Sequence, residues 1–346
     1  MIDYPDAPNL IKRLFIIEEL AMLNNSQALI MTKDNEIIYN KDKIDLNGVD
    51  LLPDKILVKV LYTPINPMDY YFCCHIRNKD KPLPCIPGFE SYGEVIGVGD
   101  PKDQNMVGKR VLVIPLYGTY CSYIVVDRKE IVCIGIEDPQ VKKYFAVNPL
   151  TAMGLMELIT VNNARCIIQT GASTQVGKMV ISMARERGIC TINIVRNDKY
   201  KEVLENLGAD YVINSNDPNF IYSLNRLCDQ LKPTMAFDCI GGELVSVVFK
   251  NLAYKGTLIV YGLLSLMPVI NIDCNEINAK EKRIEGFHVF HSFWKNKSPK
   301  EIDKMLKNFY ARGFDGEDSV SYFKPENFKQ ALEQWPNRTS KFIIKF

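Results

Sequence analysis

A short polar loop at residues 170–177, with the sequence TGASTQVG, has the spacing of a loop that binds the phosphates of a dinucleotide. Such loops commonly read Gly-x-Gly-x-x-Gly, because the glycines permit a tight turn and a close approach of the backbone to a pyrophosphate. The last glycine of the pattern is Gly177, whereas Ala172 and Thr174 occupy the first two glycine positions. Thr174 narrows the space but adds a hydroxyl donor, so the loop is a variant of the dinucleotide-binding pattern.

The segments on either side of the loop support the same interpretation. A continuous apolar run at 164–170 is typical of a buried parallel strand, and residues 176–188 have the pattern of a helix that ends at Gly188. The N-terminus of a helix presents free N–H groups and the positive end of the helix dipole, and both favour a phosphate. The predicted phosphate-binding residues are Gly171, Ala172, Ser173, Thr174, Gln175, Val176 and Gly177.

Arg196 ends the next predicted strand, at 190–196, about 20 residues after the loop. An acidic residue at this place would bind the ribose 2′-hydroxyl of NAD, whereas an arginine accommodates the 2′-phosphate of NADP with its forked donors. The sequence therefore predicts NADPH, and a solvated surface arginine is the alternative. Four residues after later predicted strands are expected to line the same crevice: Cys239, Gly241, Tyr261 and Gly262.

Histidines and cysteines are poorly arranged for a metal. Cys73, Cys74 and His75 are adjacent, and adjacent residues in a strand or helix face different ways. The remaining histidines are His288 and His291, and a zinc site needs three or four nitrogen or sulfur ligands. We therefore expect no zinc.

Composition is that of a soluble protein with two domains. The 346 residues include 42 Lys and Arg against 41 Asp and Glu, so the net charge of +1 does not favour nucleic acid. Ten cysteines without a Cys-x-x-Cys pair indicate a reducing compartment. An apolar run of about 18 residues, which a membrane span would need, is missing from the sequence.

The pattern of elements changes near residue 149. Before it, short β-rich runs separated by turns predict strands and no long helix up to about residue 139. After it, strands alternate with helices, which predicts an α/β domain with a doubly wound parallel sheet (a Rossmann domain). The final run at 341–346 is expected to return to the β-rich domain.

The N-terminal segment has its own helical pattern. Apolar residues within 10–23 recur at helical spacing, while early acidic residues and a single arginine are unlike a transit peptide. Two interpretations stay open. The helix packs on its own domain, or residues 8–23 dock on a protein assembly.

Nine short segments follow one another in a characteristic order. They are PINPMD (64–69), GFESYGEVIGVG (88–99), NPLTA (148–152), TINIVR (191–196), LGADYVI (207–213), DCIGG (238–242), YKGTLIVYG (254–262), GFHVFHSFWKNKSP (286–299) and TSKFII (339–344). From about residue 28 to the end, the chain resembles the medium-chain dehydrogenase/reductases. Within them it resembles the zinc-free mitochondrial trans-2-enoyl-thioester (enoyl-CoA/ACP) reductases of fatty acid metabolism.

The resemblance implies a domain arrangement. It places a β-rich, GroES-like substrate domain at 26–148 plus 290–346 and a Rossmann dinucleotide-binding domain at 149–289, after an extension at 1–25. It also implies a homodimer, a mitochondrial location, an enoyl-thioester substrate in the cleft, and a cofactor contact from Thr151. Phe89 stands where zinc-dependent relatives carry a histidine of Gly-His-Glu, so it cannot bind a metal.

The catalytic position departs from the family pattern. Asn66 belongs to the Asn-Pro-x-Asp motif, after which these reductases carry a tyrosine that polarises the substrate or donates a proton. Counting without gaps places Arg77 at that tyrosine, and Arg is a poor general acid because its pKa lies above about 12. Tyr70 and Tyr71 lie nearby in sequence and are the candidates to substitute for that tyrosine, each by a different backbone path. Three functions stay open: an enoyl reductase, an inactive reductase homologue (a pseudoenzyme) in a larger mitochondrial assembly, and a quinone-type NADPH reductase.

Overall fold

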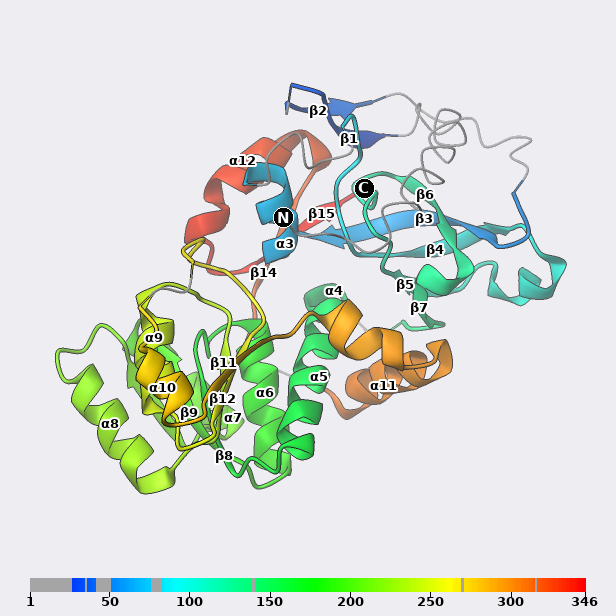
Figure 1. The fold of residues 1–346 in the computed structure, drawn as a ribbon. Coiled ribbons are helices and arrows are strands. Elements are labelled where there is room, and N and C mark those ends of the chain that lie inside the picture. The colour runs from blue at the N-terminus through cyan, green and yellow to red at the C-terminus, as the bar shows by residue number, and fades with distance from the viewer. Residues whose placement is uncertain are drawn as a thin grey trace. The chain divides into compact units, whose positions relative to one another are not determined.

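The computed structural model describes residues 27–34, 36–41, 51–75, 83–137, 141–268, 271–314 and 316–346. The chain divides into two compact units (Figure 1). Unit 1 ends at Lys142 and resumes at Ser319, and unit 2 runs from Lys143 to Asp318. Helix α4 (Val141–Tyr144) contains the first of these boundaries.

Unit 2 is built on a parallel sheet. Its strands, within the described residues, are β8 (Cys166–Gln169), β9 (Cys190–Val195), β10 (Tyr211–Asn214), β11 (Met235–Asp238), β12 (Thr257–Val260) and β13 (Arg283–Gly286). They lie in the order β10-β9-β8-β11-β12-β13, and every neighbouring pair is parallel. Numbered from β8, this order is 3-2-1-4-5-6, which is that of a doubly wound dinucleotide-binding sheet. The predicted fold class is confirmed.

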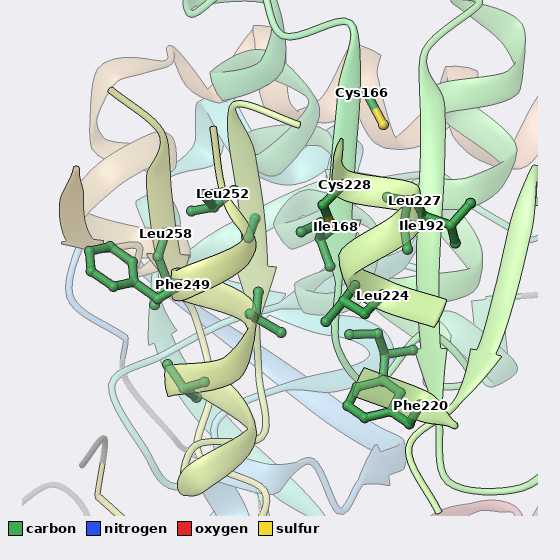
Figure 2. Close-up of a cluster of buried hydrophobic side chains, with 14 residues drawn as sticks. Cys166, Ile168, Ile192, Phe220, Leu224, Leu227, Cys228, Phe249, Leu252 and Leu258 are labelled. Atoms are coloured by element: carbon green, nitrogen blue, oxygen red, sulfur yellow. The ribbon is translucent and has the colours of Figure 1, made fainter. Parts of the chain in front are cut away.

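Helices cover both faces of this sheet. They are α5 (Val147–Val161), α6 (Gln175–Glu186), α7 (Lys201–Leu207), α8 (Phe220–Leu231), α9 (Glu243–Asn251), α10 (Cys274–Asn278) and α11 (Pro299–Arg312). On one face, Ile168 and Ile192 of the strands pack with Leu224 of α8 and Phe249 of α9 (Figure 2). Strands covered on both faces are apolar throughout, which explains the continuous run around β8.

The second face of the sheet has a smaller cluster. Val195, at the end of β9, packs there with Ile181 of α6 and Leu204 of α7. Glycines follow two of these helices: Gly188 has φ of 63° and Gly208 has φ of 103°. Both angles lie in the left-handed region, which glycine adopts readily at the end of a helix. The two glycines therefore predicted correctly where these helices end.

Unit 1 is mostly β-structure. Its described strands are β1 (Ala28–Met31), β2 (Ile37–Asn40), β3 (Lys55–Pro64), β4 (Ser91–Val98), β5 (Arg110–Val113), β6 (Tyr123–Asp127), β7 (Ile131–Ile134), β14 (Val320–Phe323) and β15 (Lys341–Lys345). The main sheet has the order β14-β15-β3-β4-β5-β7, and β6 pairs with β3. The last strand, β15, runs antiparallel to β3 with Ile344 opposite Thr63. The C-terminus therefore returns to the β-rich unit, as the sequence indicates.

Unit 1 also contains helices between its strands. Helix α3 (Pro67–Cys74) follows β3, and helix α12 (Phe328–Gln334) lies between β14 and β15. Helix α3 starts immediately after Asn66, which is its N-cap, and has Pro67 in its first turn and Asp69 in a capping box. These are standard signals for a helix start, and they outweigh the β-rich surroundings.

Residues 143–148 and 290–318, which the family resemblance assigned to the β-rich domain, lie in unit 2. The reason is the packing of α11. Its buried residues include Leu306, Phe309 and Tyr310, and the Tyr310 hydroxyl donates a short hydrogen bond to the Phe145 carbonyl of the same unit.

Candidate active site

The loop after β8 turns directly into helix α6. Gly171 has φ of 58°, which favours glycine, and Thr174 is the N-cap of α6. The Thr174 Oγ1 accepts a hydrogen bond of 3.1 Å from the Gly177 N–H. The hydroxyl thus satisfies one of the free donors at the helix start and keeps its own proton to donate.

Gly177 is required by close packing. A Cβ at this position would lie 2.6 Å from the Ala172 carbonyl oxygen, a distance at which backbone must move. Gln169, at the end of β8, holds the same turn because its Nε2 donates to the Gly177 carbonyl at 3.1 Å and to Asn193 Oδ1 at 2.7 Å. The strand end therefore fixes where the helix begins.

The Gln175 side chain is bound within unit 2. Its Oε1 accepts from Asn148 Nδ2 at 2.7 Å, and its Nε2 donates to the Lys143 carbonyl at 3.1 Å. Both the oxygen and the nitrogen of the Gln175 amide are thus hydrogen-bonded to protein groups. Among the described residues, the backbone N–H groups of Gln175 and Val176 have no acceptor, as expected for the first turn of a helix.

Asp238 ties the loop after β11 to the phosphate loop. Its Oδ1 accepts from Thr170 Oγ1 at 2.5 Å, and its Oδ2 accepts from the Gly241 N–H at 2.9 Å. Burial raises the pKa of Asp238, while the hydrogen bonds from Thr170 and Gly241 oppose that shift. Cys239 lies against Gly171 of the phosphate loop, since a Cβ on Gly171 would be 2.6 Å from the Cys239 sulfur.

Tyr261 and Gly262 follow β12 at the same edge of the sheet. A Cβ on Gly262 would lie 2.9 Å from the Cys239 Cβ, so glycine permits this close approach. The Tyr261 hydroxyl is buried near Cys239 and Thr174. By distance and angle it forms no hydrogen bond of ordinary geometry with the described residues. Burial, followed by the neighbouring Cys239, raises the pKa of this phenol. Glycines that permit close backbone approach, next to a buried hydroxyl, fit a dinucleotide-binding loop.

Arg196 stands one residue beyond β9 and is exposed. The phosphate loop is connected to the end of the same strand, because the Ala172 N–H donates to the Ile194 carbonyl at 3.2 Å. Among the described residues, no acidic side chain forms an ion pair with Arg196. Thr151 is buried in α5, where its hydroxyl donates to the Val147 carbonyl at 2.7 Å.

Unit 1 contains a buried polar network at the start of α3. The Asn66 Nδ2 donates to Glu90 Oε2 at 2.9 Å, and Lys341 Nζ donates a short hydrogen bond to Asn66 Oδ1. Asp69 Oδ2 accepts from the Asn66 N–H at 2.7 Å, and its Oδ1 accepts from the Phe89 N–H at 3.1 Å. The amide of Asn66 is therefore engaged by charged partners inside the unit.

The Asp69 carboxyl of this network is buried. Burial raises its pKa from the ordinary 3.8 to about 7, and the nearby Glu90 adds to the rise. The hydrogen bond from the Asn66 N–H and the charge of Lys341 oppose it. The carboxyl thus changes its charge near neutral pH.

The tyrosines of α3 lie in an aromatic cluster. The Tyr70 ring stacks on Trp335 with a centroid distance of 4.3 Å, and the Arg338 guanidinium lies 3.4 Å from the Trp335 centroid. Burial raises the pKa of Tyr70 and lowers the pKa of Arg338 to about 10. Tyr71 lies against His75 with ring centroids 6.0 Å apart.

Arg77 and the segment 8–23 lie outside the described residues. Cys73 is buried, whereas Cys74 is exposed. Phe89 packs edge-on against Phe72. In the described part of the chain, no three His, Cys, Asp or Glu side chains form a group that could hold a metal ion. None of the helices described there is long and apolar enough to span a membrane.

Several residues that organise these sites were not singled out by the sequence analysis. They are Gln169, Asp238, Asp69, Glu90, Lys341, Trp335 and Arg338. The signal for Asp238 was present, because a carboxylate that ends a buried strand must be hydrogen-bonded. Lys341 lies 275 positions from Asn66 in the chain, and no local pattern indicates such a pair.

Two family models match the chain. The alcohol dehydrogenase GroES-like domain matches residues 52–172, and the zinc-binding dehydrogenase model matches residues 176–309. The mitochondrial enoyl-[acyl-carrier-protein] reductase of Arabidopsis thaliana is 31% identical over 311 residues, which cover 87% of this chain and 80% of that protein. The human enzyme of the same name is 29% identical, with 80% and 77% covered. The chain belongs to the mitochondrial enoyl-thioester reductase family of the medium-chain dehydrogenase/reductases.

Solved structures share the fold at lower identity. The mitochondrial 2-enoyl thioester reductase heterodimer of Candida tropicalis has a TM-score of 0.74 at 20% identity, covering 93% of this chain and 99% of that chain. A quinone oxidoreductase of Pseudomonas syringae has a TM-score of 0.73 at 18% identity, covering 93% and 98%. The fold is therefore common to reductases with different substrates, and function must be argued from the residues.

Proposed function

We propose that the chain is a mitochondrial NADPH-dependent reductase of 2-enoyl thioesters. The observation that carries the proposal is the intact phosphate loop, in which Thr174 caps α6 and Gly177 permits close contact with Ala172. The relatives named mitochondrial enoyl-[acyl-carrier-protein] reductase support the substrate class and the location.

The chain's own groups account for cofactor binding. The N–H groups of Gln175 and Val176 would donate to the pyrophosphate at the start of α6. The Arg196 guanidinium would bind the 2′-phosphate, since an arginine fork matches phosphate oxygens. The Tyr261 hydroxyl would gain a hydrogen-bond partner of ordinary geometry. When bound, NADPH supplies the hydride for the β-carbon of the conjugated thioester.

Protonation of the substrate is where this chain differs from the family. After hydride addition, the α-carbon carries enolate character and needs a proton. Arg77 would stabilise the enolate by its permanent charge, but it retains its own proton at neutral pH. We infer that solvent delivers the proton, which makes turnover slower than with a tyrosine at this position.

Steady-state assays test the proposal. Purified protein should oxidise NADPH in the presence of crotonyl-CoA, and Arg77→Tyr should raise kcat by about 10-fold or more, in line with general acid catalysis. Arg77→Lys is the matched control, because it keeps the charge without adding a good acid. Consumption of NADPH with a quinone but not with crotonyl-CoA would instead favour the quinone-type reductase.

A second candidate function is a non-catalytic subunit, and Arg77 in place of the family tyrosine favours it. A non-catalytic subunit can lose its proton donor, because folding does not need that residue. It can still keep NADPH, since a bound ligand stabilises the native state. The apolar segment 8–23 would then bind a partner. If this role is real, deletion of residues 1–25 releases a folded protein from a native mitochondrial complex. A free homodimer in mitochondrial extracts that reduces crotonyl-CoA would exclude it.

A further inference from the structure

Two cysteines face each other across the neighbouring strands β8 and β9. Cys166 opens β8, Cys190 opens β9, and the two are direct register partners. Directly paired residues of parallel strands project from the same face of a sheet. Both cysteines accordingly pack in the same hydrophobic cluster, Cys166 as a buried member and Cys190 at its partly exposed edge (Figure 2 labels Cys166).

The spacing of the strands suits a disulfide. Neighbouring strands lie about 4.8 Å apart, and a disulfide joins residues whose Cα atoms are about 4.4–6.8 Å apart. The parallel pairing of β8 and β9 holds the two backbones at this spacing. The interaction of the neighbouring thiols lowers the pKa of Cys190 and raises that of Cys166. The thiolate therefore forms more readily at Cys190, which is also the more exposed of the two cysteines.

We propose that Cys166 and Cys190 form a redox-active thiol pair that a peroxide oxidises to a cross-strand disulfide. The Cys190 thiolate attacks one peroxide oxygen, the O–O bond breaks, and a water leaves after protonation, so that Cys190 becomes a sulfenic acid. Cys166 then attacks the Cys190 sulfur and gives up its proton, the S–O bond breaks, and a second water leaves. Two thiols lose two electrons and two protons, and hydrogen peroxide takes them up as two waters.

Other cysteines are less suited to this chemistry. Cys228 of α8 belongs to the same cluster but is buried, and burial raises its pKa to about 12. Cys74 and Cys274 are exposed, yet neither faces a second thiol across a strand pair. The pair lies where β8 and β9 begin, whereas the phosphate loop and Arg196 follow where these strands end. The proposal is therefore independent of cofactor binding and of the reaction.

Peptide mapping tests the pair in the full chain. Trypsin cuts after Arg165 and Lys178 and after Arg187 and Arg196, so the cysteines lie in separate peptides, 166–178 and 188–196. The protein is treated with hydrogen peroxide, its free thiols are alkylated, and the unreduced digest is analysed by mass spectrometry. We expect one linked product of these two peptides, which dithiothreitol separates.

Variants assign the roles of the two sulfurs. Cys190→Ser should abolish the link and leave Cys166 as a free thiol, whereas Cys166→Ser should leave a Cys190 sulfenic acid that a dimedone probe traps. Cys228→Ser and Cys274→Ser are the matched controls and should keep the link. Alkylated Cys190 in peroxide-treated native protein, or a link from Cys190 to any other cysteine, would overturn the proposal. The native-protein measurement decides even where a variant fails to fold.

Discussion

At the scale of single residues, we propose that the choice of cofactor depends on Arg196. The guanidinium is exposed just beyond β9 and forms no ion pair with the described residues, so its donors are free for an incoming anion. The Ala172 N–H holds the phosphate loop on the same strand end. One molecule that spans both groups would carry a pyrophosphate and a 2′-phosphate.

Arg196→Ala should weaken NADPH binding by about 10- to 100-fold, the equivalent of one charge-assisted hydrogen-bonded pair, and should leave NADH binding unchanged. Calorimetric titration with both cofactors measures this. Arg226→Ala removes an exposed arginine from α8 and serves as the control. Equal losses for the two cofactors, or no loss for either, would exclude a role in reading the 2′-phosphate.

The protonation of Asp69 should affect the stability of unit 1. Its pKa in the folded protein is about 7 against an ordinary 3.8, so the native state holds this proton more tightly than the unfolded chain. The associated stability is fully present below about pH 4 and is lost as pH rises through 7.

The free energy of unfolding should therefore fall by on the order of 3 kcal/mol between pH 4 and pH 8 through this group. Asp69→Asn removes the titration, so its stability curve should be flatter across the same range. Urea denaturation at several pH values gives both curves. Parallel curves for the two proteins would mean that Asp69 does not titrate near neutrality.

At the scale of elements, the candidate phosphate site lies where strand β8 ends and helix α6 begins. Gln169 of β8 binds the Gly177 carbonyl, and Thr174 binds the Gly177 N–H. Gly177 has no room for a side chain beside Ala172. A methyl group there would displace the first turn of α6 and its free donors.

Gly177→Ala should reduce NADPH affinity by at least about 10-fold and destabilise the fold by about 1–3 kcal/mol, the cost of overpacking. Gly97→Ala is the control, because its Cβ would lie 3.3 Å from the tip of the Leu51 side chain and in ordinary contact with Leu57. Binding and thermal unfolding of both variants are compared. A Gly177→Ala protein with normal affinity would show that the helix start does not hold the cofactor.

The sequence predicted local features well. Apolar runs located β8 and β12, and glycines located the stops after α6 and α7, because these depend on neighbouring residues alone. The partners of the candidate sites could not be predicted, since Thr170–Asp238 and Asn66–Lys341 join residues 68 and 275 positions apart. Gln175 illustrates the difference. The sequence places Gln175 among the phosphate-binding residues, whereas in the structure Asn148 and Lys143 bind its side chain.

At the scale of the whole molecule, β13 is an edge strand. It pairs with β12 on one side, its four residues are exposed, and Ile284 is among the exposed large hydrophobics. Exposed strand edges with apolar side chains invite pairing with another chain. We infer that a second copy pairs along β13, which would give the homodimer that the family resemblance implies.

Light scattering after size-exclusion chromatography should thus report a dimer for the full chain. Ile284→Asp should shift it to the monomer, because it places a charge in the paired edge. Ile221→Asp on α8 alters another exposed isoleucine and should leave the dimer intact. Dimers in both variants would show that another surface forms the contact.

The most direct test of function follows the hydride itself. NADPH carrying deuterium at the transferable C4 position is mixed with the protein and crotonyl-CoA in ordinary water, and the butyryl-CoA is analysed by mass spectrometry and NMR. We expect one deuterium at the β-carbon and a solvent proton at the α-carbon. Absence of butyryl-CoA when NADPH is bound, or product without deuterium at the β-carbon, would contradict enoyl-thioester reduction by this chain.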